Sequence, residues 1–461
     1  MKDLTKGQES RLILNFALPM LLGNVFQQLY NIVDSVIVGN FIGKEALAAV
    51  GASFPIIFTL ISLIIGIAFG TTIVIAQYFG AKDIANVRKA IDTLYIFLFF
   101  TSIIVTVVGI RFSEPIFRLL RLPEEILPQA KSYMNVYMLG AIAFFGFNGT
   151  SAILRGLGDS KTPMYFLIIS TFFNIGFDLL FVLVFKWGIV GVAVATIIAQ
   201  GGAFLTAVIY LNKYHQVIQV SVFRMKFDRD IFLKSFRIGL PTGFQHTFVA
   251  LGRMALLGIV NTFGTDVIAA YSVAGRIDSI AALPAMNFSA ALATFVGQNL
   301  GANKPLRVRA GFHATLWMSS LISLTVTVLV LFFGEFFMSL FTPDPEVIRI
   351  GREYLVIVSS FYLIFSALFT TSGVMRGAGD TLVPMFITLF SLWIVRIPLS
   401  YLLSRSMGET GIWWAIPIGW SMGLTISYAY YLTGRWKKKV VVKYQQPETE
   451  EIQSFTAKAP S

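Results

Sequence analysis

The ten residues RGLGDSKTPM at 155–164 return as RGAGDTLVPM at 376–385, and six of the ten are identical. A second pair of segments, AQYFGAKD at 76–83 and GQNLGANK at 297–304, is separated by the same 221 residues. Two matches with one spacing indicate that the 461-residue chain consists of two related halves. Repeats of this kind in an apolar chain are typical of transport proteins built from two lobes.

The composition places both halves in a lipid bilayer. Hydrophobic residues make up 56% of the chain, charged residues 13%, and the mean hydropathy is +0.74. Apolar stretches long enough to cross the hydrocarbon core recur along the sequence. We predict twelve of them, at 12–38, 46–76, 90–112, 131–153, 163–185, 189–211, 233–261, 267–297, 312–336, 350–373, 383–404 and 410–434. The predicted fold is therefore an all-α polytopic membrane protein with six helices in each lobe.

The first predicted span is a retained helix rather than a signal peptide, because it continues past Val36 into Gly39 without a small-residue cleavage site. An even number of spans gives the halves the same orientation, so a pseudo-twofold axis along the membrane normal is expected to relate them. The predicted organisation is an N-lobe at 1–211, a connector at 212–232, a C-lobe at 233–434 and a basic, disordered tail at 435–461.

The net charge of +12 raises the question of nucleic-acid binding, but the basic residues gather on one side of the predicted membrane. Alternate loops carry 24 Lys and Arg on one side and 9 on the other, and three Arg fall within spans. By the positive-inside rule, both termini and the connector are then predicted to be cytoplasmic. The membrane is predicted to be the plasma or inner membrane of the cell. The segment VFRMKFDRDIF at 222–232 is predicted to be a helix on the membrane surface. No nucleic-acid partner is expected.

The sequence contains few residues that could bind a metal ion or carry out thiol chemistry. There is no cysteine, and the three histidines are His215, His246 and His313. These do not form a zinc-ligand pattern, and no nucleophile with a nearby base stands out. We therefore expect neither an enzyme nor a cofactor. The repeated turns have a structural interpretation, in which their glycines allow tight turns and Arg155 pairs locally with Asp159.

The halves differ most clearly inside the predicted spans, where four polar residues of the first half face aliphatic residues of the second. The pairs are Asp34 with Leu256, Asn174 with Val395, Asp178 with Leu399, and Thr196 with Ile416. At 1.5 Å per residue, Asp34 lies about 8 Å from the outer end of its span, and Asp178 and Thr196 lie about 12 Å from theirs. These side chains are expected to meet in one cavity in the outer part of the N-lobe, which Gln27, Asn31 and Asn148 are also candidates to line.

Two carboxyl groups at this depth are costly and repel each other when both are charged. Binding a cation relieves both costs. Either a proton on one carboxyl group or Na⁺ held by Asp34, Asn174, Asp178 and Thr196 would couple the cavity to an ion gradient. The alternative is a structural hydrogen-bond network that joins three helices. No other metal site is predicted.

The C-lobe has its own membrane charges, and their balance is positive. They are Arg253, Arg276, Asp278 and Arg396. We favour structural pairing of the arginines with Asp278, and the alternative is contact with an anionic substrate.

The chain resembles the multidrug and toxic compound extrusion (MATE) family over residues 10–435. The resemblance rests on the ALP at 17–19, LYNIVDSVIVG at 29–39, LAAVG at 47–51, AQYFGA at 76–81 and the repeated RGxGD turn. Proton-coupled, DinF-like members of that family have an Asp in helix 1, an Asn and an Asp one turn apart in helix 5, and a Thr in helix 6. Those positions match the four residues that the comparison of halves isolates.

The resemblance implies antiport, in which ion entry from outside drives drug release. It also implies a conformational switch at a helix-1 proline, which would be Pro19, although a proline in a membrane helix also serves packing alone. Members that bind sodium in the C-lobe use acids on helices 7 and 10, and residues 241–260 and 354–375 contain none. C-lobe sodium binding is therefore not expected.

These features predict an antiporter, driven by protons or sodium, that exports amphipathic and often cationic drugs or toxic compounds. It would act as a monomer in the bilayer, with a small-molecule substrate. The alternatives are a flippase for lipid-linked saccharides, an exporter of an anionic or zwitterionic metabolite, and a membrane scaffold or intramembrane enzyme.

Overall fold

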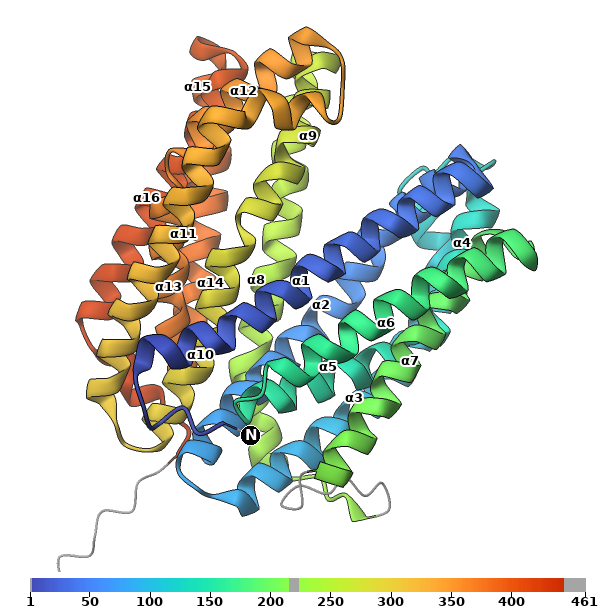
Figure 1. The fold of residues 1–461 in the computed structure, drawn as a ribbon. Helices are drawn as coiled ribbons and strands as arrows, with labels where there is room; N and C mark the ends of the chain where they lie inside the picture. Colours follow the sequence, from blue (N-terminus) through green and yellow to red (C-terminus); the bar gives the residue numbers. More distant parts are fainter. Residues whose placement is uncertain (1, 215–223, 443–461) are drawn as a thin grey trace, which may run out of the picture.

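The computed structural model describes residues 2–214 and 224–442, and every regular element in these ranges is a helix (Figure 1). The first half contains α1 (Glu9–Ile37), α2 (Lys44–Gly80), α3 (Ile84–Leu119), α4 (Leu127–Leu139), α5 (Ala141–Gly156), α6 (Lys161–Leu179) and α7 (Gly188–Tyr214). The second half contains α8 (Arg229–Val260), α9 (Thr265–Ala281), α10 (Leu283–Gly301), α11 (Pro305–Ser339), α12 (Pro345–Ser359), α13 (Tyr362–Ala378), α14 (Leu382–Leu389), α15 (Ile397–Met407) and α16 (Glu409–Leu432).

These helices form six spans in each half, as the sequence predicts. Nine spans in the described ranges are long and apolar enough to cross a membrane unbroken, among them α9 with α10 and α14 with α15. Two more are bent, by 51° between α4 and α5 and by 49° between α12 and α13. The 24-residue α16 occupies the twelfth position, and its many Trp and Tyr residues lower its hydropathy.

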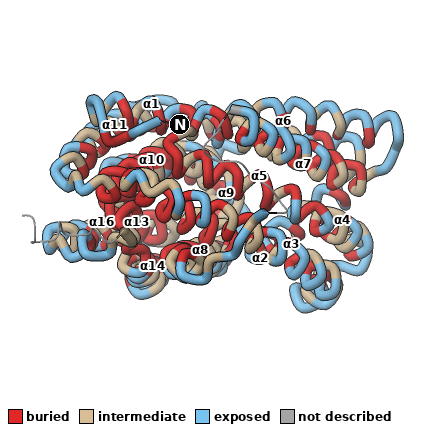
Figure 2. Tube along the Cα trace, turned by 90° about the horizontal axis from the view of Figure 1, so that it is seen from below, coloured by how far each residue is buried: buried red, intermediate tan, exposed pale blue. Residues whose placement is uncertain are grey.

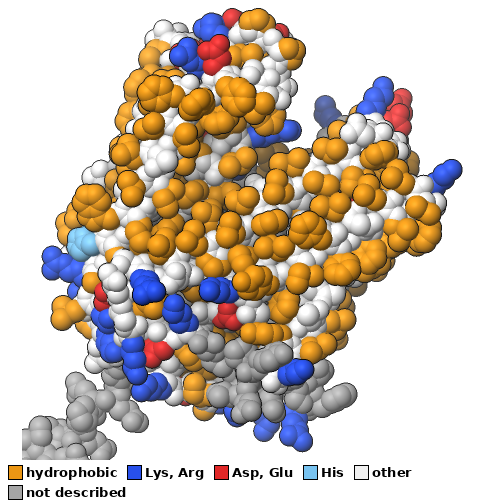
Figure 3. All heavy atoms as spheres, viewed as in Figure 1, with side chains coloured by type: hydrophobic (Ala, Val, Ile, Leu, Met, Phe, Trp, Pro, Cys, Tyr) orange, Lys and Arg blue, Asp and Glu red, His pale blue; other side chains and the backbone are white. Residues whose placement is uncertain are grey.

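The two halves form two arms that meet at one end of the molecule and separate at the other (Figure 1). We call the end with the first described residues the closed end, and the other the open end. The space-filling view shows a hollow between the arms at the open end (Figure 3). The arms join where α2 packs against α8 and α10, and where α1 packs against α10 and α11.

The outer surface has the distribution of a membrane protein. Hydrophobic side chains cover the middle of both arms, whereas Lys and Arg gather at the closed end (Figure 3). Viewed from the closed end, buried residues concentrate along α5, α10 and α13, and the outward faces of α6, α7 and α11 are exposed (Figure 2). Large apolar side chains such as Phe100, Ile104 and Phe332 are more than half exposed, which lipid but not water would tolerate over so wide an area.

The crossing of α2 and α8 depends on four glycines. Gly66 and Gly70 on α2 meet Gly239 and Gly243 on α8, so both helices present glycines four residues apart. A Cβ atom at Gly66 would lie 2.6 Å from the Cα atom of Gly243, and one at Gly239 would lie 2.6 Å from the Gly66 carbonyl oxygen. Only the absence of side chains lets the backbones of the two lobes approach this closely.

Two buried glutamines connect the lobes reciprocally at the closed end. Gln77 of α2 donates to the Gly377 carbonyl at 3.1 Å and accepts from the Val441 backbone N–H at 2.7 Å. Gln298 of α10 donates to the Gly156 carbonyl at 3.1 Å and accepts from the Leu4 backbone N–H at 2.9 Å. These glutamines are 221 residues apart, so the two repeated motifs meet each other across the lobes.

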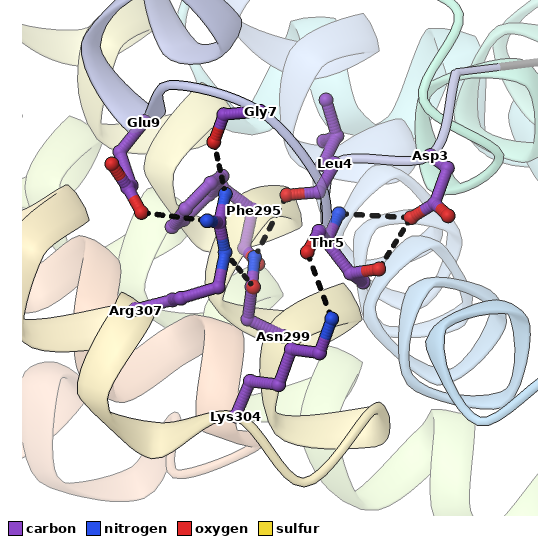
Figure 4. Close-up of polar contacts among 9 residues, drawn as sticks. All are labelled: Asp3, Leu4, Thr5, Gly7, Glu9, Phe295, Asn299, Lys304 and Arg307. Atoms are coloured by element: carbon purple, nitrogen blue, oxygen red, sulfur yellow. Dashed lines mark hydrogen bonds and ion pairs between the residues drawn. The ribbon is translucent and has the colours of Figure 1, made fainter.

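The N-terminal strap, residues 2–8, extends this connection over α10 and α11 (Figure 4). Asn299 donates to the Leu4 carbonyl at 3.2 Å, and Lys304 donates to the Thr5 carbonyl at 3.0 Å. Arg307 donates to the Gly7 carbonyl at 2.8 Å and forms an ion pair with Glu9 at 2.7 Å. The strap therefore holds the start of α1 on the C-lobe.

Three local predictions differ from the structure. Asp159 does not pair with Arg155, because its carboxylate instead accepts from the backbone N–H groups of Lys161 and Thr162 at the start of α6. The surface helix expected at 222–232 is absent from its described part, since 225–228 are not helical and Asp228 caps α8 by accepting from the Ile231 N–H. Helices α7 and α8 thus extend into the predicted connector.

The third difference concerns the predicted tail, whose first residues are ordered. Trp436 is buried and stacks on Tyr431, and Val441 binds Gln77. His215 and the rest of 215–223 lie outside the described residues, as does the predicted disordered stretch from Lys443 onwards.

Candidate functional site

Three helices of the N-lobe bring together the four polar residues that the sequence comparison singles out. Asn174 and Asp178 lie one turn apart on α6, Asp34 lies near the end of α1, and Thr196 lies on α7. The hydrogen-bond pattern orients the Asn174 amide with its nitrogen towards the two acids. That nitrogen donates to Asp34 Oδ1 at 3.1 Å and to Asp178 Oδ2 at 3.2 Å.

The remaining contacts close this cluster. The Asn174 oxygen accepts from the Thr196 backbone N–H at 3.3 Å, and the Thr196 hydroxyl lies 3.0 Å from the Tyr30 hydroxyl. Tyr30 and Asp178 are also hydrogen-bonding neighbours of the Asp34 carboxyl group. Asp178 is fully buried, with 0% exposure, and Asn174 is nearly so. The cluster is therefore a compact polar site within the arm.

A small cavity of about 10 Å³ adjoins this cluster, which is near the minimum that holds one water molecule. Gln27, Asn174 and Thr196 line it, together with Tyr30, Leu167, Ser170, Thr171, Ala199 and Gln200. Asn31 instead donates to Gln28, at 3.3 Å, and Asn148 donates to the Phe144 carbonyl of its own helix, at 2.8 Å. Of the three proposed lining residues, the structure brings only Gln27 to this cavity.

The site holds two carboxyl groups without a basic partner. In the described part of the chain no ion pair includes Asp34 or Asp178. Asp178 Oδ1 is buried without a hydrogen-bond partner. Two neighbouring carboxylates cannot both stay charged in such surroundings, so one must take up a proton or both must share a cation.

The donor set suits either a proton or Na⁺. Carboxylate and hydroxyl oxygens can serve both ions, and the Asn174 amide can turn its nitrogen towards the acids or its oxygen towards a cation. Na⁺ held there by all four residues would require the amide to turn its oxygen inward. No group of three or more His, Cys, Asp or Glu in the described ranges could hold a metal ion.

Tyr30 is the functional candidate that the sequence comparison misses. It lies one turn before Asp34 on α1, and that spacing of four residues places both side chains on one face. Its hydroxyl connects Asp34 to Thr196, which makes it part of the same network. Helical spacing from Asp34 is the signal that would have found it. Pro19 is buried within α1, which continues unbroken through it.

The C-lobe charges do not pair as the sequence suggests. Asp278 of α9 accepts from the Tyr362 hydroxyl at 2.8 Å, and no described ion pair includes Asp278 or any of Arg253, Arg276 and Arg396. The charges of Arg253 and Arg396 act on Asp278 without direct contact. The predicted ion pair is thus wrong, because the tyrosine hydroxyl satisfies the carboxylate in place of a guanidinium group.

The chain is similar to known proteins over most of its length. A family model described as MatE matches residues 19–180 and 241–402, one segment in each half. The chain is 34% identical over 436 residues to the probable multidrug resistance protein YpnP of Bacillus subtilis, covering 94% of this chain and 97% of that protein. It is 24% identical over 445 residues to an FAD transporter of Shewanella oneidensis, covering 94% and 97%.

The fold is similar to that of a solved structure described as the outward-facing conformation of a multidrug resistance MATE family transporter of the MOP superfamily. The TM-score is 0.89, the identity is 23%, and the match covers 95% of this chain and 99% of that one.

Proposed function

The chain belongs to the MATE family of multidrug transporters, and we propose that it exports amphipathic organic compounds in exchange for protons that enter through the N-lobe site. As a member of this family it is a polytopic membrane transporter and not an enzyme. We expect it to act as a monomer without a cofactor, because one chain supplies both lobes and the complete polar site.

One observation supports ion coupling most directly: the two acids share the Asn174 amide but have no basic partner among the described residues. A purely structural network would be more stable with one acid replaced by an amide, because burying a second carboxyl group costs free energy. Reversible binding of a cation during transport would explain why the site contains a second acid. Proton coupling is preferred to sodium coupling because Asp34, Asn174, Asp178 and Thr196 match the set that the resemblance assigns to proton-coupled members of the family.

The arrangement of the arms supports alternating access. The hollow opens at the open end, while the α2–α8 crossing, the paired glutamines and the strap shut the closed end. The excess of basic loop residues supports a cytoplasmic position for the closed end, and this state would then face outward.

Transport by the reconstituted wild-type protein tests this function. Proteoliposomes would be offered a fluorescent lipophilic cation under a pH gradient alone, and separately under a sodium gradient alone. We expect concentrative transport with the pH gradient. Transport with the sodium gradient only would replace the proton by Na⁺, and no transport with either gradient would contradict the proposal.

The paired glutamines give a prediction for the closed end. Replacing both, as Gln77→Ala and Gln298→Ala, removes four hydrogen bonds between buried groups of opposite lobes and should let this end open. The chain lacks cysteine, so spin labels at Lys161→Cys and Arg435→Cys are specific. We expect pulsed electron paramagnetic resonance to show a larger share of long distances between the two spin labels in the double variant than in the wild-type chain.

The control for this experiment is Gln8→Ala, because Gln8 belongs to the strap only through its backbone and its exposed side chain makes no contact between the lobes in the described ranges. Identical distance distributions for the double variant and the control would show that the glutamines do not hold the lobes together.

A second candidate function is export of an anionic or zwitterionic metabolite. The relative named as an FAD transporter and the positive balance of the C-lobe charges favour it. No comparable observation favours a flippase for lipid-linked saccharides.

A further inference from the structure

The C-lobe contains a group of charged residues with no role in the ion site just described. Arg253 lies on α8, Asp278 on α9, and Arg396 at the end of the π-helical turn Phe390–Arg396 between α14 and α15. With two arginines and one aspartate the group carries a net positive charge. Such π-helical turns occur frequently at functional sites.

These arginines are available to a ligand. Asp278 has its hydrogen bond from Tyr362, and neither arginine approaches it as an ion pair. The Nε atom of Arg396 is buried without a hydrogen-bond partner. A buried donor of this kind costs free energy until an acceptor reaches it, and a guanidinium group prefers a carboxylate, sulfonate or phosphate.

The group faces the hollow between the lobes. Arg253 is exposed seven residues before Val260 at the open end of α8, which is about 10 Å of helix rise, and a charge at that depth is costly against lipid. The hollow is the remaining space, and Figure 3 shows basic side chains on the C-lobe wall of the hollow.

Aromatic side chains pack beside these charges, with Trp413 and Tyr354 buried and Tyr271 half-buried. Tyr271 stacks on Trp413 with ring centroids 5.6 Å apart, and Tyr354 packs edge-on against Trp413 at 5.0 Å. The charges of Asp278, Arg253 and Arg396 act on Tyr354, so the aromatic group and the charged group are neighbours. The half-buried ring of Tyr271, held in place by the two buried rings, is the part that an apolar ligand body could contact.

The broken repeat places this group opposite the ion site. With the offset that pairs Asp34 and Leu256, Arg253 corresponds to Asn31, and Arg396 follows Val395, the partner of Asn174. Transferred to the first half, the two arginines fall three residues from Asp34 and Asp178, so acids in the N-lobe and arginines in the C-lobe lie within one helical turn of equivalent positions.

We propose that Arg253 and Arg396 form a subsite for the anionic group of an amphipathic aromatic substrate, beside the ring of Tyr271, which Trp413 supports. This inference rests on the proposed transport function and extends its substrate class to compounds that carry an acidic group. The coupling cation would bind in the N-lobe and the anionic group of the substrate in the C-lobe, so the two would not compete for the same residues.

Two dyes with the same xanthene core test the subsite. Fluorescein is anionic and a rhodamine ester is cationic, and fluorescence anisotropy would measure the binding of each to the purified full chain. In the variant Arg253→Gln with Arg396→Gln we expect fluorescein to bind at least about tenfold more weakly, which is the effect of one lost charge-assisted hydrogen bond. Rhodamine should bind as well as before or more tightly.

The matched control removes two other arginines from the same lobe, as Arg349→Gln with Arg405→Gln. Arg349 pairs with Glu346 on α12, and Arg405 stacks on Tyr401 near the open end. Fluorescein binding should be unchanged in the control. Equal losses in both variants, equal losses for both dyes, or no fluorescein binding by the wild-type chain would overturn the subsite.

The transport assay separates this inference from the proposed function. If the subsite is wrong but the function is right, the Arg253→Gln, Arg396→Gln variant transports rhodamine under a pH gradient and binds fluorescein normally. If the function is wrong but the subsite is right, no gradient drives either dye, and fluorescein binding still depends on the two arginines.

Discussion

Asp34→Asn and Asp178→Asn are each expected to reduce export driven by a pH gradient to the level of empty vesicles. Each change removes one ionisable group from a pair that shares the Asn174 amide. The remaining acid then has no charged neighbour whose repulsion would drive it to take up a proton. The amide is nearly isosteric and uncharged, so folding and membrane insertion should be preserved or improved. Uptake of the fluorescent cation into proteoliposomes measures the loss.

Binding of the fluorescent cation to the purified variants separates this coupling defect from a structural one. Both variants should still bind substrate, whereas a disrupted hydrogen-bond network would also weaken binding. Asp266→Asn is the control, because Asp266 is exposed at the open end of α9 and far along the chain from the site. Full gradient-driven export by Asp34→Asn and Asp178→Asn would remove both acids from the coupling mechanism.

Gly66→Ala is expected to have the second largest effect, at the crossing of α2 and α8. The added methyl group would lie 2.6 Å from the Cα atom of Gly243, and a backbone atom cannot move aside as a side chain does. Overpacking of this kind costs about 1–3 kcal/mol, and 1.4 kcal/mol changes an equilibrium about tenfold. The closed end should therefore open in a large share of molecules, which the spin labels at Lys161→Cys and Arg435→Cys would detect.

Gly51→Ala provides the comparison, since Gly51 lies in the same helix and a methyl group there would meet nothing within 4 Å. It should leave the distance distribution unchanged and increase helix stability slightly. If Gly66→Ala and Gly51→Ala gave the same distances, the close approach of the two backbones would not be what shuts this end.

Much of the fold follows from the sequence because lipid imposes simple rules. The apolar lengths predict the spans, and the repeat predicts two equivalent lobes, which the structure and the family confirm. The four site residues could be selected because the second half has aliphatic residues in their places. Their convergence then required only helical spacing and depth, and the contacts of Asn174 show it.

Other features depend on contacts between distant residues, which spacing does not reveal. The reciprocal bonds of Gln77 and Gln298 join positions about 300 and 142 residues away in sequence. Tyr362 takes the place beside Asp278 that an arginine was predicted to fill, because the bend between α12 and α13 brings its hydroxyl there. The ordered start of the C-terminal segment depends on the buried packing of Trp436, which a basic composition conceals.

The central claim is that the acids of the N-lobe exchange a proton for substrate. Its most direct test is the proton release that follows addition of the fluorescent cation to purified protein in weakly buffered detergent solution, measured with a pH-sensitive dye. The wild-type chain and Asp266→Asn should release protons to the same extent, and the double variant Asp34→Asn, Asp178→Asn should release none. Undiminished release by the double variant, or no release by the wild-type chain, would contradict the claim.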